Sequence, residues 1–324
     1  VEIHLGNLIL KQEVKMKKVA FIFPGQGSQT IGMGRDFFEN SDTAKEMIKK
    51  ASERLNIDFE KLLFEENENL GKTEFTQPAI LLISSIALAV FKEKFKIEPE
   101  FVLGHSLGEF SALVAAGAID YLDAIELVNK RGTFMNEACS GGGAGMMALL
   151  GLDDEKVEAM CKEQREAGKK VWPANYNMDG QLVLAGLKAD LESLVDTFKA
   201  AGAKRALVLD MSVASHCELL QSAVENLKPY LFEFLNDEFL DVVSNVSAEV
   251  YNTKDEAIEF LSSQLISPVK YKQSIKAHDS KVDLYIEFGN GAVLKGLNKK
   301  SSEKPTLNVS DMKTLNETIE ALND

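Results

Sequence analysis

The segment Phe101-Val-Leu-Gly-His-Ser-Leu-Gly108 predicts both the fold of this chain and the place of its chemistry. Its apolar start indicates the end of a buried strand, and the residues after it predict a helix that stops at Gly117. A serine between two glycines, in a tight turn from strand to helix, is the pattern of a nucleophile elbow. The glycines remove Cβ atoms that would clash in such a turn, so we expect Ser106 to stand exposed at the N-terminus of the helix.

Strands and helices alternate on both sides of this segment. Lys18 to Phe23 predicts a buried strand, and Thr76-Gln-Pro78 predicts the start of a long helix with a hydroxyl cap and a proline in its first turn. Asp120 predicts the cap of a helix that runs to about Ala138, and Val282 to Phe288 predicts another buried strand. This order is typical of a parallel sheet covered by helices.

The segment after Ala138 has a different order of elements. The cluster Ser140-Gly-Gly-Gly143 predicts a hinge. The elements expected beyond it are a strand at 146–150, a helix at 153–167, strands at 170–175 and 181–185, a helix at 188–201 and a strand at 204–209. This βαββαβ order is that of ferredoxin-like folds. We therefore expect a large α/β domain, residues 16–138 and 211–324, interrupted by a small domain, residues 139–210.

The composition limits the classes of function. The 324 residues carry 36 Lys+Arg against 50 Asp+Glu, a net charge of −14, which argues against nucleic-acid and anionic-membrane partners. The longest apolar run, Ala79 to Val90, is too short to cross a bilayer of about 30 Å and is expected to be a buried helix. The 4 histidines lack metal-ligand spacing, so we expect neither a metal nor another cofactor.

The amino terminus and the cysteines bear on localisation. Residues 1–15 lack the basic start and the small-residue cleavage site of a secretory signal, and they precede Met16, which opens the first predicted strand. We expect them to be an extension that arises from a misassigned start or a tag. The 3 cysteines form no disulfide framework and suit a reducing cytoplasm, which is the expected location.

Two further segments carry candidate chemistry. Phe23-Pro-Gly-Gln-Gly-Ser-Gln29 lacks the remaining residues of a nucleotide loop, so its glycines either free backbone N–H groups for an oxyanion or form a plain turn. His216, at a loop between the two expected domains, is the best general base among the histidines, although a core or surface role fits its spacing equally. Cys217 is the second candidate nucleophile, and a small buried residue is the simpler interpretation.

Arg131 lies on an apolar stripe of its predicted helix. It is spaced with Ala124, Val128 and Met135 at intervals of four, three and four, which predicts a buried guanidinium. A buried guanidinium requires an anionic partner. That partner is either a structural Asp or Glu or the carboxylate of a substrate.

Together these motifs resemble the malonyl-CoA:acyl carrier protein transacylases of bacterial fatty acid synthesis, over essentially everything from Met16 onward. The segments that carry the resemblance are Phe23-Pro-Gly-Gln-Gly-Ser-Gln29, Gly104-His-Ser-Leu-Gly-Glu109, Arg131, Ala174-Asn-Tyr-Asn177 with Gly180-Gln-Leu-Val, Ser215-His-Cys217, Gln264, and the glycine turn Gly289 to Leu297. The resemblance implies an α/β-hydrolase-like core with a parallel sheet, an inserted ferredoxin-like subdomain, and an active site between them.

The resemblance also implies a role for each site residue. Ser106 would be the nucleophile and His216 its base, with the main-chain carbonyl of Gln264 orienting the histidine in place of a catalytic Asp. The backbone N–H groups of Gln26 and Leu107 would form the oxyanion hole, and Arg131 would bind the malonyl carboxylate. Three residues are expected to support or line the pocket: Asn175, Asn177 and His105. The chain departs from the family pattern at Asn290, where proline is usual, and at Met178-Asp179, where Ser-Pro is common.

The implied reaction transfers malonyl from malonyl-CoA to the phosphopantetheine thiol of holo-acyl carrier protein through a malonyl-serine, with ping-pong kinetics. The enzyme is expected to act as a monomer. Because the carrier protein is acidic, we expect a basic patch near the site mouth, although scattered solubilising residues fit equally. The residues expected to form it are Lys169, Lys170, Lys204, Arg205, Lys270 and Lys272.

Two other functions fit some of these residues. A serine esterase or thioesterase would use the same elbow and histidine, but it would have no reason to bury Arg131 if its substrates were neutral. A non-catalytic acyl-binding module would bind the thioester without acylating Ser106.

Overall fold

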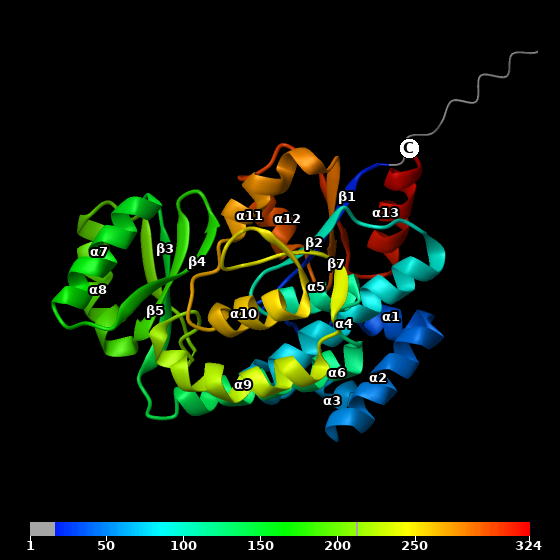
Figure 1. The fold of residues 1–324 in the computed structure, drawn as a ribbon, viewed down its shortest axis with the longest axis horizontal. Helices are drawn as coiled ribbons and strands as arrows, with labels where there is room; N and C mark the ends of the chain where they lie inside the picture. Colours follow the sequence, from blue (N-terminus) through cyan, green and yellow to red (C-terminus); the bar gives the residue numbers. More distant parts are fainter. Residues whose placement is uncertain (1–16, 212) are drawn as a thin grey trace, which may run out of the picture.

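The computed structural model describes residues 17–211 and 213–324, and within them the chain forms two β-sheets. Figure 1 shows the larger sheet with its helices on the right and the smaller sheet, flanked by α7 (Asp154–Glu166) and α8 (Lys188–Ala200), on the left. The predicted extension, residues 1–15, lies outside the described residues. The protein is therefore of the mixed α/β class, as the sequence predicts.

The larger sheet has the strand order β10-β9-β1-β2-β7-β8. All of its pairs are parallel except β7 with β8. Its strands are β1 (Val19–Phe23), β2 (Phe101–Gly104), β7 (Glu238–Val243), β8 (Val250–Thr253), β9 (Leu284–Phe288) and β10 (Thr306–Val309). Every residue of β1, β2 and β9 is buried, which is typical of parallel strands covered on both faces.

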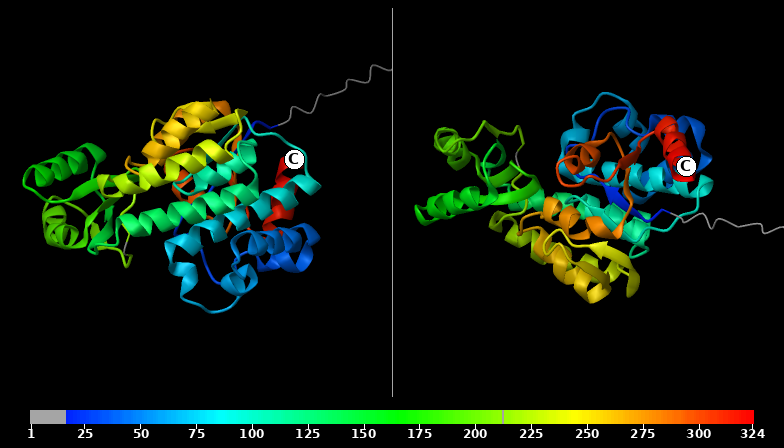
Figure 2. Two further views of the ribbon diagram at one scale, coloured as in Figure 1. Left: turned by 60° about the horizontal axis from the view of Figure 1, so that its bottom comes forward. Right: turned by 90° about the horizontal axis from the view of Figure 1, so that it is seen from above.

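Helices pack around this sheet, and Figure 2 shows the long ones lying side by side. Helix α6 packs against both α4 and α9. The α-helices of this part are α1 (Arg35–Asn40), α2 (Asp42–Leu55), α3 (Phe59–Phe64), α4 (Thr73–Lys94), α5 (Gly108–Ala116), α6 (Tyr121–Ala138), α9 (Gln221–Phe234), α10 (Lys254–Gln264), α11 (Tyr271–His278), α12 (Val293–Asn298) and α13 (Met312–Asn323). Short 3₁₀ turns lie at η1 (Asn69–Gly71), η2 (Glu218–Leu220) and η3 (Asp279–Lys281).

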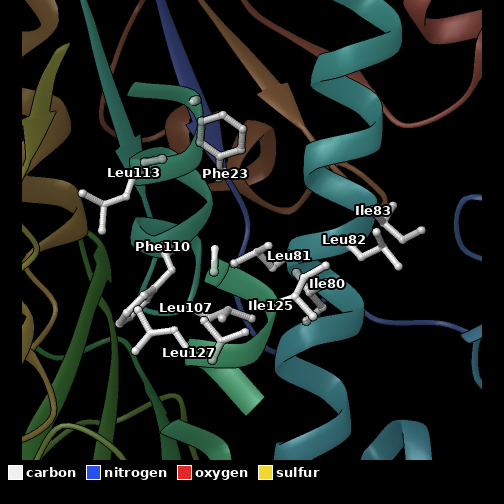
Figure 3. Close-up of a cluster of buried hydrophobic side chains, with 14 of the residues drawn as sticks. Phe23, Ile80, Leu81, Leu82, Ile83, Leu107, Phe110, Leu113, Ile125 and Leu127 are labelled. Atoms are coloured by element: carbon white, nitrogen blue, oxygen red, sulfur yellow. The ribbon is translucent and has the colours of Figure 1, made fainter. Parts of the chain in front are cut away.

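The hydrophobic core next to the elbow joins the sheet to α4, α5 and α6. Figure 3 shows Leu107 and Phe110 beside Ile125 of α6 and Ile80 of α4. These side chains are between 0% and 2% exposed, and each fully buried aliphatic or aromatic side chain of this size stabilises the fold by about 1.5–3 kcal/mol. The core therefore fixes Leu107, the residue that follows Ser106.

Helix α4 begins earlier than the sequence predicts. Its N-cap is Lys72, so Thr76 is not the cap, and Pro78 lies inside the helix. A proline there cannot donate to the carbonyl of Glu74, and Asn129 Nδ2 donates to that carbonyl instead at 2.8 Å. Since a neighbouring helix supplies the missing donor, the proline is tolerated beyond the first turn.

By length and composition alone, α4 is also apolar enough to cross a membrane. However, 83% of its most apolar window is buried inside the protein, which fits the core helix that the sequence predicts for Ala79 to Val90.

The smaller sheet has the strand order β4-β5-β3-β6, and all of its pairs are antiparallel. Its strands are β3 (Ala144–Leu150), β4 (Val171–Met178), β5 (Gln181–Leu187) and β6 (Arg205–Val208). With α7 and α8 they follow one another in the predicted βαββαβ order. Strand β4 continues past the predicted end at 175, which carries it toward the larger sheet.

Backbone hydrogen bonds join the smaller sheet to the larger part of the fold. The N–H of Val269 donates to Ala174 O at 2.8 Å, and the N–H of Tyr176 donates to Val269 O at 2.9 Å. Asn175 and Val269 thereby form a parallel bridge. These bonds lie outside the glycine segment 140–143, where the sequence predicts a hinge.

Candidate active site

Ser106 occupies the predicted turn between β2 and α5. Its φ of 53° is in the left-handed region, which is unusual for a residue with a side chain and is a form of local strain found at functional sites. A Cβ at Gly104 would lie 1.8 Å from the carbonyl carbon of Gly108, and a Cβ at Gly108 would lie 2.1 Å from Phe23 O. Both glycines of the motif are therefore required by close backbone approach, as the sequence predicts.

The side chain of Asn245 stabilises this turn through two hydrogen bonds. Its Oδ1 accepts from the N–H of Ser106 at 2.7 Å, and its Nδ2 donates to Gly104 O at 2.7 Å. Asn245 is fully buried just beyond the end of β7. No motif in the sequence points to Asn245, although a polar residue directly after a buried parallel strand is a usable signal for a site residue.

A chain of hydrogen bonds links Ser106 to His216 and Gln264. Ser106 Oγ lies 2.7 Å from His216 Nε2, and His216 Nδ1 lies 2.7 Å from the main-chain oxygen of Gln264. Since a carbonyl only accepts, Nδ1 must carry the proton, which leaves Nε2 as the acceptor for the serine hydroxyl. Burial and the positive charge of Arg131 lower the pKa of His216 to about 3, so the imidazole is neutral near pH 7.

Arg131 is 1% exposed and faces the same serine. Its Nη1 donates to Gln77 Oε1 at 2.9 Å and its Nη2 to Gln264 Oε1 at 3.0 Å, while Nη2 lies 3.5 Å from Ser106 Oγ. Its Nε has no hydrogen-bond partner in the described part of the chain. Within that part the guanidinium meets neutral amides rather than a carboxylate, which leaves the site able to take an anion.

The loop Phe23 to Gln29 lies against the elbow. A Cβ at Gly25 would lie 2.2 Å from His105 O, so only glycine permits this approach. Among the hydrogen bonds of the described residues, neither Gln26 N–H nor Leu107 N–H is used as a donor. Both residues line the cleft of about 320 Å³ that Ser106, Arg131 and His216 also line.

The remaining predicted pocket residues come from both parts of the fold: Asn175 and Asn177 lie in β4 of the smaller sheet, and His105 lies in the turn after β2. Asn177 Oδ1 lies 2.7 Å from His105 Nε2, so a hydrogen bond joins the two parts of the fold beside the elbow. Asn175 and Asn177 both line the cleft. The structure thus gathers all nine predicted site residues around one cleft or directly behind it.

Two departures from the family pattern are accommodated locally. Asn290 Nδ2 donates to Ser28 O at 2.6 Å and to Thr30 Oγ1 at 2.9 Å, which ties the glycine turn to the loop beside the elbow. Asp179 pairs with Lys276 at 2.7 Å and with Lys272 at 3.2 Å.

The basic-patch prediction is wrong for Lys272. Its ammonium is buried and paired with Asp154 and Asp179, so it offers no free positive charge. Two lysines outside the predicted patch, Lys72 and Lys188, line a cavity of about 740 Å³ that adjoins the cleft at Ser106. The sequence shows that Lys272 is charged, but it does not show that the fold brings Asp154 and Asp179 beside it.

The other candidate groups do not join the site. Cys217 is 1% exposed, and burial raises the pKa of its thiol to about 12, which disfavours a nucleophilic thiolate. Over residues 17–211 and 213–324, no group of three His, Cys, Asp or Glu side chains is placed to hold a metal ion.

A strained serine on an elbow above a parallel sheet, hydrogen-bonded to a neutral histidine, is typical of enzymes that transfer acyl groups through a serine. A family model described as "acyl transferase domain" matches residues 20–316. The "malonyl CoA-acyl carrier protein transacylase" of Bacillus subtilis is 43% identical over 95% of this chain and 98% of its own length. The chain belongs to the malonyl CoA-acyl carrier protein transacylase family, and it is accordingly an acyltransferase.

Solved structures agree with this assignment. The malonyl-CoA:acyl carrier protein transacylase of Helicobacter pylori is 44% identical and superposes with a TM-score of 0.92, over 95% of this chain and 99% of that one. A second structure, 37% identical with a TM-score of 0.89 over 94% and 99%, is a malonyl-transacylase in complex with its type II PKS acyl-carrier protein.

Proposed function

We propose that this protein transfers the malonyl group of malonyl-CoA to the phosphopantetheine thiol of holo-acyl carrier protein through a malonyl-serine intermediate, for use in fatty acid elongation. The observation that carries the proposal is that Ser106 Oγ lies close to two functional side chains, 2.7 Å from His216 Nε2 and 3.5 Å from Arg131 Nη2. One atom is thus close to both a base and a cation, and the relatives are named for this reaction.

In the first half-reaction, Ser106 Oγ attacks the thioester carbonyl while its proton passes to His216 Nε2. The carbonyl of Gln264 on Nδ1 stabilises the imidazolium that forms. Collapse of the tetrahedral intermediate breaks the C–S bond, and the coenzyme A sulfur takes the proton from His216. A malonyl ester of Ser106 remains.

The negative charge on the carbonyl oxygen needs donors that are already in place. We assign this role to the backbone N–H groups of Gln26 and Leu107, because both are unused by the described residues and both line the cleft. Loss of one such donor typically costs about 10²-fold to 10³-fold in rate.

In the second half-reaction, the phosphopantetheine thiol gives its proton to His216 and attacks the ester carbonyl. Collapse of the intermediate breaks the bond between the acyl carbon and Ser106 Oγ, which takes the proton back from His216, and this order gives ping-pong kinetics. We assign selectivity to Arg131, because an acetyl group would leave its buried guanidinium without an anion. The adjoining cavity of about 740 Å³ shares Gln26 and Asp210 with the cleft and gives room for the long arm of either thiol. Asn175, Asn177 and His105 are assigned to the pocket wall.

The proposal also divides the fold into two subdomains. We assign residues 16–138 and 211–324 to an α/β-hydrolase-like subdomain and residues 139–210 to a ferredoxin-like subdomain, supported by the strand orders of the two sheets. A monomer in the cytoplasm, without membrane association, is proposed with it. The free, buried state of Cys139, Cys161 and Cys217 supports the cytoplasmic location.

The test is the formation and discharge of the acyl-enzyme. Intact-protein mass spectrometry after mixing with malonyl-CoA is expected to show a malonyl adduct that holo-carrier protein removes. Apo-carrier protein, which lacks the thiol, is the matched control and should leave the adduct in place. Rapid loss of the adduct to water, indifferent to the thiol, would favour the esterase or thioesterase. Thioester binding without any adduct would favour the acyl-binding module.

The pH dependence of acylation follows from the lowered pKa of His216. His216 acts as a base only when its imidazole is neutral. Activity is therefore lost only as the pH falls through the pKa of His216 in the folded protein, which is about 3, whereas a free histidine has a pKa of about 6.5. We expect the acylation rate constant kcat/KM to stay level from pH 8 down to about pH 5. The measurement is quenched-flow mass spectrometry with acetyl-CoA, which lacks a carboxylate that would titrate. An acid limb between about pH 6 and 7 would contradict it.

A further inference from the structure

A buried carboxylate that the proposed mechanism does not use lies one helical turn after the nucleophile. Glu109, on α5, is 1% exposed. It accepts hydrogen bonds from Tyr251 Oη at 2.8 Å, from Gln264 Nε2 at 2.7 Å and from the N–H of Asn245 at 3.2 Å. Three donors from three separate segments converge on this one group, so its acceptor oxygens have a defined position.

Two acceptors determine which way the side-chain amide of Gln264 points: Glu109, at 2.7 Å from Gln264 Nε2, and the main-chain oxygen of Ser106, at 3.1 Å from the same nitrogen. A carbonyl only accepts, and so does the ionised form of Glu109, so Gln264 must turn its NH₂ toward Ser106 O and Glu109 and its Oε1 the other way. That Oε1 accepts from Arg131 Nη2 at 3.0 Å. With the amide reversed, an NH₂ would face the guanidinium, and two donors would oppose each other. Glu109 therefore influences the position of Arg131 indirectly, through the side chain of Gln264.

This indirect arrangement suits a site that must bind an anion. A carboxylate placed directly on the guanidinium would occupy the positions that a substrate carboxylate needs. With Gln264 in between, the guanidinium is oriented by neutral oxygens, and its Nη2 still lies 3.5 Å from Ser106 Oγ, where the acyl group would be held. The link does not run through the base, because His216 is held by the main-chain oxygen of Gln264 rather than by its side chain.

Given the proposed function, on which this inference rests, we propose that Glu109 is a positioning residue that fixes the Gln264 amide and thereby holds Arg131 in place for the malonyl carboxylate. The acceptor position, rather than the charge, carries the effect. Burial raises the pKa of Glu109 to about 7, so its charge is not a constant feature of the site near neutral pH.

The test compares two conservative variants. Glu109→Gln keeps an acceptor oxygen at the same reach and removes the charge, whereas Glu109→Asp keeps the charge and withdraws the oxygens by one methylene. For each variant and the wild type, the rates of Ser106 acylation by malonyl-CoA and by acetyl-CoA are measured by quenched-flow mass spectrometry. The readout is the ratio of the two rates, which a general loss of folding does not change.

We expect Glu109→Asp to lower the malonyl-to-acetyl ratio by about tenfold or more and Glu109→Gln to keep it within about threefold of the wild type. An unchanged ratio in Glu109→Asp overturns the proposal, and so does a ratio lowered in Glu109→Gln as much as in Glu109→Asp, because the charge would then carry the effect. If Glu109→Asp does not fold, Gln264→Asn withdraws the amide from the opposite side and must lower the same ratio. A wild type that forms no adduct would instead refute the proposed function itself.

Discussion

Replacing Ser106 with alanine is expected to abolish the malonyl adduct and to lower malonyl transfer by about 10⁴-fold to 10⁶-fold. The reason is that the substitution removes the atom that forms the covalent intermediate, while the remaining hydrogen bonds still bind substrate. The measurement is intact-protein mass spectrometry after mixing with malonyl-CoA, together with the rate of malonyl transfer to holo-carrier protein.

The chain offers a matched control on the same helix. Ser111 is buried on α5, and its hydroxyl has no hydrogen-bond partner in the described part of the chain. Ser111→Ala should therefore keep the adduct, as should Cys217→Ala. A malonyl adduct that persists in Ser106→Ala and disappears in Cys217→Ala would transfer the nucleophile role to the thiol.

Replacing Arg131 with alanine is expected to lower malonyl acylation by about 10²-fold to 10³-fold and to leave acetyl acylation much less affected. The buried carboxylate of the malonyl group would lose its partner, whereas an acetyl group has no charge to leave unpaired. Acylation rates with malonyl-CoA and acetyl-CoA, measured side by side, check the prediction.

Arg131→Lys is the control for charge alone. An ammonium keeps the positive charge but does not reproduce the planar fork that contacts Gln77 and Gln264 together. We expect it to recover only part of the malonyl rate. Equal losses with both substrates in Arg131→Ala would show that the arginine supports the fold and does not select the acyl group.

The parts of the site with a local sequence signal were predicted from the sequence. Ser106 lies between glycines in a strand-to-helix turn, and the apolar spacing of α6 placed Arg131 in the interior, where it is 1% exposed. His216 lies in a loop between the two predicted domains, which makes it the best candidate base among the histidines, and the family resemblance implies the same role. In each case the neighbours along the chain carry the information.

The residues that support these groups have no such signal. Asn245, Gln77 and Glu109 act through contacts with segments more than 50 residues away in the sequence. A single Asn or Gln in a chain of 324 residues is not distinctive until the fold brings it beside a partner. For the same reason Lys272 was expected to lie free at the surface, whereas the fold pairs it with two aspartates.

The strand-like bridge at Val269 has a consequence for how the enzyme meets its two substrates. To move the two sheets apart, the chain would have to break the two backbone hydrogen bonds that join Val269 to Ala174 and Tyr176, and to separate Asn177 from His105. These hydrogen bonds fix the distance between the two parts of the fold along one side of the cleft at Ser106. In the proposed reaction, the arms of coenzyme A and of the carrier protein therefore enter in turn past the same hydrogen-bonded contact, without moving the two sheets apart.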